Sequence, residues 1–597
     1  MNEVQRTRPS GSQTEKLVYF PRSDGSRIPY KVYSSRQLYD LEQERIFRGP
    51  VWSFVALEAE IPNPGDFKST FVGDTPVVVT RNDDGSLSAW VNRCAHRGAA
   101  VCRATRGNAR SHVCAYHQWS YDTRGNLRGV PFRNGIKGSP GMPADFNPKD
   151  HGLQHLRADS YRGLVFATFS DRAPSLYDYL GPQMRPGLDR LFHKPIAYLG
   201  CVRQYSKSNW KLYHENVRDS YHASLLHAFF STFNVVRAGT RRKAVGSDDG
   251  LHSWSMIFHT EDASGGAAYK DNKILSFKEG LRLEDLSTLA NVKEFDQLVN
   301  NHIQIIFPQL VATQILNSLA VRQILPKGPS NFELIFYFFG YTDDTPEMRM
   351  HRIKQANLVG PAGLISMEDT LATELVQFAT ASSCDAVSIA DMGRDVPDDQ
   401  QIGSGIAEGR IRSFWRGYQG VDGAINRRRA DQESLLMKTP LEEIMLWYEL
   451  HRLQERYVSV IDTDRLEEWP DLFTEDCVYE IVPKENADLG LPMGIMHCFG
   501  RAMLRDRITS LRKANVFEPH TYRHMTSGPE LAPVDANTVD MQSNYVVVQT
   551  LTDGESRIYQ AGRYFDRVVR SAEGWLYQRK RAVYDTSRVQ TLLVTPV

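Results

Sequence analysis

Several features that mark common classes of protein are scarce or absent in this chain of 597 residues. The seven cysteines are few and scattered, which excludes the disulfide framework of a small secreted protein. No segment approaches about 18 uninterrupted apolar residues, and the long apolar segment 303–321 contains Gln, Pro, Asn and Ser. The N-terminus is polar and lacks the apolar core of a signal peptide. We therefore expect a cytoplasmic protein that has no membrane partner.

Net charge is missing as well, because 71 lysines and arginines balance 71 aspartates and glutamates. This balance predicts that nucleic acid is not a partner. A dinucleotide-binding fingerprint is also absent: the nearest glycine cluster, Gly403, Gly405 and Gly409, has the wrong spacing and no strand before it. NAD(P)H could therefore act only indirectly, through another protein.

The chain does contain two mixed pairs of cysteine and histidine, Cys94 with His96 and Cys114 with His117. A structural zinc site usually has two cysteines followed by two histidines, whereas here each pair supplies one sulfur and one nitrogen. This order suits a Rieske [2Fe–2S] centre, in which two cysteines bind one iron and two histidines bind the other. We predict that these four residues hold such a cluster.

A second candidate metal site follows within residues 214–230, where Asp219, His222 and His227 form a D-x₂-H-x₄-H pattern. Two histidines and one carboxylate make the facial triad of non-heme Fe(II) oxygenases, which leaves positions open for dioxygen. On a regular helix His222 and His227 would point about 140° apart, so the helix must end or bulge between them to serve one iron. Asp219 shares the face of His222 and is better placed to hydrogen-bond that ring than to bind metal.

These motifs resemble the catalytic subunit of the Rieske non-heme iron aromatic-ring-hydroxylating oxygenases, over about residues 25–420. The resemblance implies that the third ligand of a mononuclear Fe(II) is a carboxylate in a helix that follows a Gly-Pro-Ala-Gly turn. The turn at 360–363 puts Asp369 on that position, with Glu368 as the less favoured substitute. As an alternative, both acids would simply stabilise a helix N-terminus.

The same resemblance implies a relay between subunits. A carboxylate bridge would run from His117 of one chain through Asp219 to His222 of the next, orienting the ring and shortening the electron path. We therefore expect a homotrimer that closes head to tail. Asn216 matches a polar residue near the iron in this family. The electrons for dioxygen would come from a separate reductase, a ferredoxin, or both.

The stretches 208–227, 317–328 and 360–370 are similar to the branch of the family that acts on aromatic acids, namely salicylate hydroxylases, anthranilate dioxygenase and terephthalate dioxygenase. The implied function is a terminal oxygenase that hydroxylates an aromatic acid with dioxygen. A carboxylate substrate requires a cation, and arginine can bind it through two parallel hydrogen bonds. Arg322 and Arg412 are the candidates, although a structural contact fits Arg322 equally well and Arg412 better.

Three alternatives stay open at this point. The substrate could be an aromatic compound that is not an acid, or the chain could be a Rieske electron carrier without oxygenase activity. The chain could also be a binding scaffold that uses the cone domain, with decayed upstream motifs and no iron. A carrier needs only the β domain and would hold two irons per chain, whereas the oxygenase would hold about three.

The fold class is α+β and multidomain. An all-β Rieske domain is followed by an antiparallel sheet that wraps a helix, and then by a cone-shaped domain like nuclear transport factor and ketosteroid isomerase. The last domain resembles the small subunit of the same oxygenases, so one polypeptide would join two subunits that relatives make separately. The expected divisions are a tail and helix at 1–50, the Rieske domain at 51–171, the catalytic domain at 172–420, a linker at 421–438 and the cone at 439–597.

Overall fold

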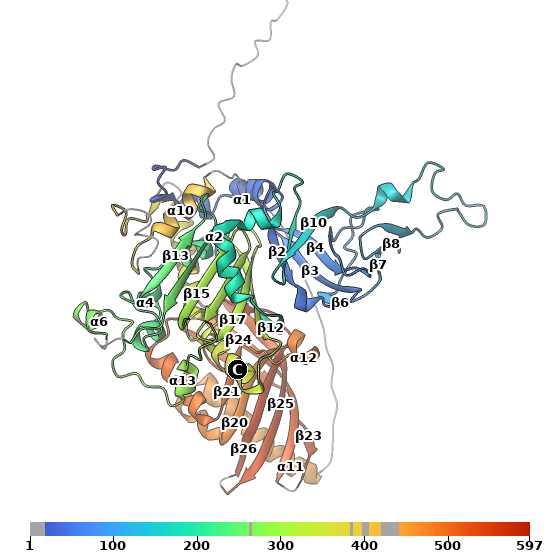
Figure 1. Cartoon of the computed structure of the whole chain (residues 1–597). Helices are drawn as coiled ribbons and strands as arrows, with labels where there is room; N and C mark the ends of the chain where they lie inside the picture. Colours follow the sequence, from blue (N-terminus) through green and yellow to red (C-terminus); the bar gives the residue numbers. More distant parts are fainter. Residues whose placement is uncertain are drawn as a thin grey trace, which may run out of the picture.

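The computed structural model describes residues 18–261, 266–295, 297–382, 386–396, 405–419, 441–535, 537–572 and 574–597. The first 17 residues and the expected linker at 421–438 lie outside these ranges. Figure 1 shows three sheet-rich parts, which we call the arm (residues 53–168), the central part (172–419) and the cone (441–597). The arm projects sideways from the central part, and the cone packs beneath it.

The arm consists of short antiparallel strands joined by tight turns. A seven-stranded sheet has the order β2-β11-β10-β5-β4-β3-β6, and β7, β8 and β9 form a separate three-stranded sheet. The strands are β2 (Ser53–Leu57), β3 (Asp66–Val72), β4 (Thr75–Arg81), β5 (Leu87–Val91), β6 (Arg106–Asn108), β7 (Ser111–Val113), β8 (Ser120–Asp122), β9 (Leu127–Gly129), β10 (His155–Tyr161) and β11 (Leu164–Thr168).

The central part is built on an eight-stranded sheet with the order β13-β14-β15-β16-β17-β18-β12-β27. Its strands are β12 (Ile196–Ser206), β13 (Arg242–Gly246), β14 (Ser253–Phe258), β15 (Val299–Ile306), β16 (Leu310–Ile315), β17 (Ser318–Pro326), β18 (Phe332–Tyr341) and β27 (Val589–Gln590). A further two-stranded sheet pairs β1 (Arg27–Pro29) with β19 (Val387–Ile389).

The two faces of this sheet pack in different hydrophobic clusters, because successive side chains of a strand point to opposite sides. Leu319 and Val321 of β17 pack in one cluster with the long helix α2 (Leu176–Leu191), whereas Ala320 belongs to the core on the other face. The second face carries Arg322 as well, and it is the face that the candidate site uses.

The remaining helices connect and cover these sheets. Ser35 caps the first of them by accepting a hydrogen bond from Leu38 N, and Glu42 at its end accepts one from Trp210 of the central part. The helices are α1 (Arg36–Glu42), α3 (Trp210–Asn216), α4 (Ala223–Leu226), α5 (Ala228–Thr232), α6 (Ala267–Asp271), α7 (Pro346–Gln355), α8 (Met367–Thr380) and α10 (Gly409–Tyr418). Within the described ranges, no helix is both long and apolar enough to cross a bilayer.

The cone is a strongly curved sheet packed on one long helix. Burial alternates along its longest strands, which is typical of an antiparallel sheet with one packed and one open face. The sheet order is β21-β20-β26-β25-β24-β22, with β23 beside β24. The elements are α11 (Leu441–Asp462), β20 (Phe473–Pro483), α12 (Lys484–Asp488), β21 (Met496–Phe499), α13 (Arg501–Lys513), β22 (His520–Thr526), β23 (Glu530–Pro533), β24 (Thr538–Leu551), β25 (Ser556–Ser571) and β26 (Gly574–Tyr584).

The cone and the central part are joined by a shared β-sheet and by hydrogen bonds. After β26 the chain returns to the central part, where β27 adds a parallel strand beside β12, with Gln204 opposite Val589. Asn486 of α12 also hydrogen-bonds both backbone groups of Cys201 in β12. The structure therefore confirms the α+β fold class. It also shows that the C-terminal domain is integrated with the domain before it, because β27, within the expected cone, belongs to the central sheet.

The cone core holds a buried ion pair. The Lys580 ammonium lies 2.7 Å from the Asp566 carboxylate, and both side chains are fully buried. Three aromatic rings surround the ammonium, with the centroids of Tyr457, Tyr564 and Tyr577 at 4.3, 3.8 and 4.5 Å. Lys580 therefore sits in an aromatic cage that is closed by one carboxylate.

Replacing Lys580 by Met is expected to lower the free energy of unfolding of the cone by about 3–5 kcal/mol, because Asp566 is left buried without its cation. Calorimetry of the whole protein measures the shift of the unfolding transition. Adding Asp566→Asn to Lys580→Met should recover part of the loss. If Lys580→Met alone unfolds at the same temperature as the unaltered protein, the ion pair is not important for stability.

Candidate active site

The helix between the two candidate histidines is broken, as their spacing required. The segment α4 ends at Leu226 and α5 begins at Ala228, while His227 between them has an extended backbone with φ −86° and ψ 98°. Because the chain changes direction there, the side chains of His222 and His227 turn toward one point.

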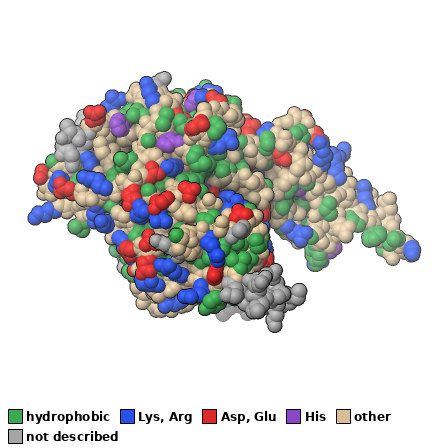
Figure 2. All heavy atoms as spheres, turned by 90° about the horizontal axis from the view of Figure 1, so that it is seen from below, with side chains coloured by type: hydrophobic (Ala, Val, Ile, Leu, Met, Phe, Trp, Pro, Cys, Tyr) green, Lys and Arg blue, Asp and Glu red, His purple; other side chains and the backbone are tan. Residues whose placement is uncertain are grey.

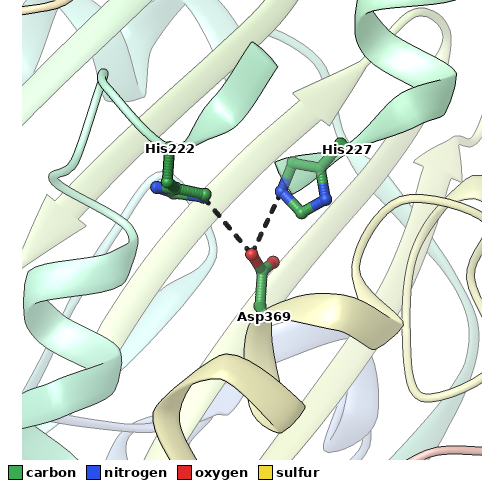
Figure 3. A group of neighbouring side chains, drawn as sticks. All are labelled: His222, His227 and Asp369. Atoms are coloured by element: carbon green, nitrogen blue, oxygen red, sulfur yellow. Dashed lines mark ion pairs between the residues drawn. The ribbon is translucent and has the colours of Figure 1, made fainter. Parts of the chain in front are cut away.

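His222, His227 and Asp369 offer ligand atoms that all lie within 4.8 Å of one another (Figure 3). Asp369 Oδ1 is 3.4 Å from His222 Nε2 and 3.2 Å from His227 Nε2. Burial alone would raise the pKa of Asp369, but the two imidazoles hold it well below its ordinary value. Two nitrogens and one carboxylate oxygen that converge in this way fit the donor set of a mononuclear Fe(II) site.

A second carboxylate stands behind each histidine ring. Asp219 Oδ2 lies 3.2 Å from His222 Nδ1, and Glu368 Oε2 lies 2.8 Å from His227 Nδ1. Glu368 thus contacts the His227 nitrogen on the outer side, away from the triad, whereas Asp369 contacts the nitrogen on the inner side, toward its centre. Asn216 Nδ2 donates a hydrogen bond of 3.1 Å to Asp369 Oδ1, which fixes the orientation of that carboxylate.

The triad opens into a pocket that both apolar and polar side chains line. Polar groups are added from the sheet and from α10 (Gly409–Tyr418). The apolar lining residues are Val217, Ala223, Phe230, Val236, Ile257, Ile303, Ile315 and Ile365, and the polar ones outside the triad include Ser220, Arg242, Ser255, Asn301, Arg322 and Arg410. A pocket that combines apolar walls with convergent polar groups is typical of a small-molecule site.

Two buried arginines face this pocket without an acidic partner among the described residues. Arg322 Nη1 donates to Tyr213 Oη at 2.8 Å, and Arg410 donates to the hydroxyls of Ser255 and Ser220 at 3.1 and 3.2 Å. The Nε of each arginine has no hydrogen-bond partner within the described chain. Burial, with the nearby Arg242, lowers the pKa of Arg410 to about 10, so the guanidinium is charged at neutral pH.

Arg412, the other candidate for the substrate carboxylate, is not among the residues that line the pocket, which agrees with the structural contact that the sequence analysis favoured for it. Its guanidinium donates to the carbonyl oxygens of Ala390 and Met392 at 2.7 and 3.1 Å, a structural role. Residues two apart on a helix point about 200° away from each other, so Arg410 faces the pocket when Arg412 faces away. Sequence reasoning missed Arg410, although the helical spacing relative to Arg412 was the available signal.

The two cysteine–histidine loops of the arm have the same backbone pattern. In the first loop Cys94 N donates to Ala99 O and Gly98 N donates to Cys94 O. In the second, Cys114 N donates to Trp119 O and Gln118 N donates to Cys114 O. Gly98 and Gln118 occupy equivalent positions, and both have a left-handed backbone, with φ of 76° and 56°.

The two histidine rings of these loops lie against each other, and both cysteines belong to one buried cluster of the arm. Both cysteines are buried and free, and the Cys94 sulfur lies 3.2 Å from Tyr121 Oη. The His96 and His117 rings are 4.5 Å apart between centroids, and His96 Nδ1 is buried without a partner in the described chain. Two buried cysteines and two adjacent imidazoles are the donor set of a Rieske [2Fe–2S] cluster.

Within one chain the two candidate centres are widely separated. In Figure 1 the end of the arm at β7 and β8 projects away from the central part, while α4, next to His222, lies on the opposite side of the molecule. The arm of a single chain therefore does not bring its own histidines to the triad.

Comparison with known proteins gives matches along most of the chain. Residues 51–140 match a Rieske [2Fe-2S] domain, 194–420 match the catalytic domain of a ring hydroxylating alpha subunit, and 443–581 match a SnoaL-like domain. The anthranilate 1,2-dioxygenase large subunit of Burkholderia cepacia is 67% identical over 68% of this chain and 96% of its own length. The small subunit from the same organism is 59% identical over 27% of this chain and its whole length.

A crystal structure of naphthalene 1,2-dioxygenase from Rhodococcus sp. bound to indole is similar in fold. Its TM-score is 0.56 at 23% sequence identity, and the match covers 66% of this chain and 94% of that one. This single polypeptide therefore matches both a large-subunit and a small-subunit relative.

Proposed function

The chain belongs to the ring-hydroxylating oxygenases that carry a Rieske [2Fe–2S] domain, and from this premise we propose that it is a terminal oxygenase hydroxylating an aromatic acid of the anthranilate type. One observation carries the substrate class: buried arginines that form no ion pair with any described residue line the same pocket as the triad. A buried cation without a counter-ion is costly, so the pocket favours an anionic ligand. The large-subunit relative named for anthranilate supports this choice.

The proposed ligands of the two centres follow from the donor sets. Cys94 and Cys114 would bind one iron of the cluster and His96 and His117 the other, while the triad would hold the mononuclear Fe(II). When bound, the cluster supplies single electrons and the mononuclear iron activates dioxygen. The protein itself aligns Asp369 through Asn216 and positions the aromatic ring among the apolar side chains of the pocket.

We place the substrate carboxylate against the arginines. Arg410 is held by two neutral hydroxyls, so both of its Nη groups are oriented, and no carboxylate of the described residues lies within ion-pair distance of it. Arg322 is held in the same way by the Tyr213 hydroxyl. An acid bound here would form charge-assisted hydrogen bonds in a site that excludes water, which fixes the ring relative to the triad.

We propose that electrons pass between chains in a closed homotrimer. The separation of the arm from its own triad supports this assembly, because a neighbouring arm is then needed. Asp219 lies beside His222 with part of its side chain exposed, so a histidine from another chain can reach it. In this arrangement His117 of one chain would donate to Asp219 of the next.

A separate ferredoxin or reductase would supply the electrons. Residues 93–137 contain nine lysines and arginines but one acidic residue, and the arm seen in Figure 2 carries several of these basic side chains. Arg93, Arg97 and Arg103 are exposed close to the first cysteine–histidine loop. A basic surface of this kind favours an acidic electron-donor protein.

The purified chain, supplied with a compatible reductase, is expected to consume dioxygen with 2-aminobenzoate and to form one hydroxylated product per dioxygen. Iron analysis should give about three irons per chain. Related neutral compounds, such as aniline, should give much slower uptake because they leave the arginines unmatched. Fast uptake with neutral aromatics alone would overturn the substrate class, and two irons per chain without uptake would indicate an electron carrier.

A further inference from the structure

The cone reaches the edge of the triad through the loop that follows α13 (Arg501–Lys513). Val516 N donates a hydrogen bond of 3.1 Å to Glu368 Oε1, and Asn515 Nδ2 lies 3.4 Å from the same oxygen. The other oxygen of Glu368 is 2.8 Å from His227 Nδ1. A continuous path of hydrogen bonds thus leads from the cone backbone to a triad ring.

The direction of these hydrogen bonds determines what the path does. A carboxylate oxygen accepts a hydrogen bond from an imidazole N–H, so the contact with Glu368 favours the proton of His227 on Nδ1 and leaves the Nε2 lone pair for the inner side of the triad. His227 Nε2 faces Asp369 Oδ1 at 3.2 Å. Glu368 therefore selects the tautomer of His227 that can bind a metal.

Glu368 itself depends on the cone. Its side chain is almost fully buried, and a buried carboxylate needs donors for both oxygens. Oε2 is served by His227, while the donors that reach Oε1 within the described chain are Val516 N and Asn515 Nδ2. Without the cone, Oε1 would be left without these partners.

The cone also holds the backbone before α8 (Met367–Thr380). Arg507 of α13 donates to Ala362 O, in the turn that precedes α8, at 2.6 Å. Its other terminal nitrogen donates to Leu593 O in the segment after β27 at 3.0 Å. The helix that bears Glu368 and Asp369 is thus fixed by the cone at its leading turn and at the Glu368 side chain.

We propose that the cone is a working component of the metal centre, in which the loop of Asn515 and Val516 orients Glu368 and Glu368 acts as a positioning residue for His227. The inference rests on the proposed function, since it takes His227 to be a ligand of the mononuclear metal. His222 differs in this respect, because its outer carboxylate, Asp219, is held by the backbone N–H of Tyr221 in the central part. The dependence on the cone is therefore specific to one histidine.

The test measures Co²⁺ binding to the full chain after selective removal of the mononuclear iron, with the cluster absorbance as a check of folding. Glu368→Gln is expected to weaken Co²⁺ binding by about 10–100-fold. Val516→Pro removes the backbone donor and should weaken binding by a similar factor, while Asn515→Ala keeps the backbone and should cause a smaller loss. His222→Ala should abolish the binding, which identifies the site.

The matched control is Asn357→Ala. Asn357 exchanges two hydrogen bonds with the backbone of His497 across the same interface, at 2.7 and 2.9 Å, away from Glu368. This variant should retain Co²⁺ affinity. Equal Co²⁺ affinity in Glu368→Gln, Val516→Pro and the unaltered chain would refute the inference but leave the proposed function standing. An equal loss of Co²⁺ affinity in Asn357→Ala and Asn515→Ala would do the same. Absence of a His222-dependent cobalt site in the unaltered chain would refute the proposed function, and the inference with it.

Discussion

Asp219→Ala is expected to lower product formation by about 100-fold or more, while the cluster absorbance stays unchanged. Asp219 is not among the proposed ligands, and its Oδ2 lies 3.2 Å from the outer nitrogen of His222. Its removal takes away both the acceptor for that ring and the proposed bridge to His117 of the neighbouring chain. Single-turnover experiments with a chemically reduced cluster measure the effect directly, because they report electron transfer without the external donor.

Mixing variants tests whether the bridge joins two chains. His117→Ala chains lack one cluster ligand but keep Asp219, whereas Asp219→Ala chains keep the cluster. Each variant alone should be inactive, and trimers assembled from both should regain part of the activity, since an intact arm can then meet an intact Asp219. No recovery in mixed trimers, or full turnover by Asp219→Ala alone, would refute the path between chains.

Local sequence was sufficient to predict the parts of the site that short segments determine. Cys94 and Cys114 begin two loops with the same hydrogen bonds, so spacing alone indicated that the loops would pair. The helix break at His227 likewise followed from the five-residue separation of the two histidines. Asp369 lies far along the chain, and only the family resemblance could join it to them.

The features that the sequence did not predict depend on long-range packing. Arg410 and Arg412 lie in one helix, and which of them faces the pocket depends on how that helix packs on the sheet. The role of Glu368 as a partner of His227 depends on a loop almost 150 residues later, which no local pattern signals. The strand β27 (Val589–Gln590) joins the central sheet in the same long-range manner.

The fusion of the two segments has a physical consequence for the metal centre. If the cone orients Glu368, a catalytic domain that lost its cone would lose the donors of a buried carboxylate next to its metal ligand. Joining both segments in one chain fixes their ratio at one to one and makes their association intramolecular. The cone would then be present wherever the triad is.

Arg410→Ala is expected to raise the KM for aromatic acids by about 10–100-fold, because charge-assisted hydrogen bonds contribute about 1.5–3 kcal/mol and each 1.4 kcal/mol is a factor of ten. The rate constant kcat should change less, since the triad is untouched. Arg410→Lys should restore part of the affinity, because it keeps the charge but loses the paired geometry. Steady-state oxygen uptake with an acid and its neutral amide measures both constants.

The comparison with two other arginines makes this prediction specific. Arg322→Ala removes the second pocket cation, so the larger rise in KM of the two variants identifies the guanidinium that contacts the carboxylate. Arg412→Ala is the control, because its guanidinium binds backbone carbonyls outside the pocket and should affect thermal stability rather than KM. The ratio of kcat/KM for the acid to kcat/KM for its amide measures the selectivity for acids. If this ratio is the same in both pocket variants as in the unaltered chain, neither arginine recognises the carboxylate, and the selectivity has to come from elsewhere in the pocket.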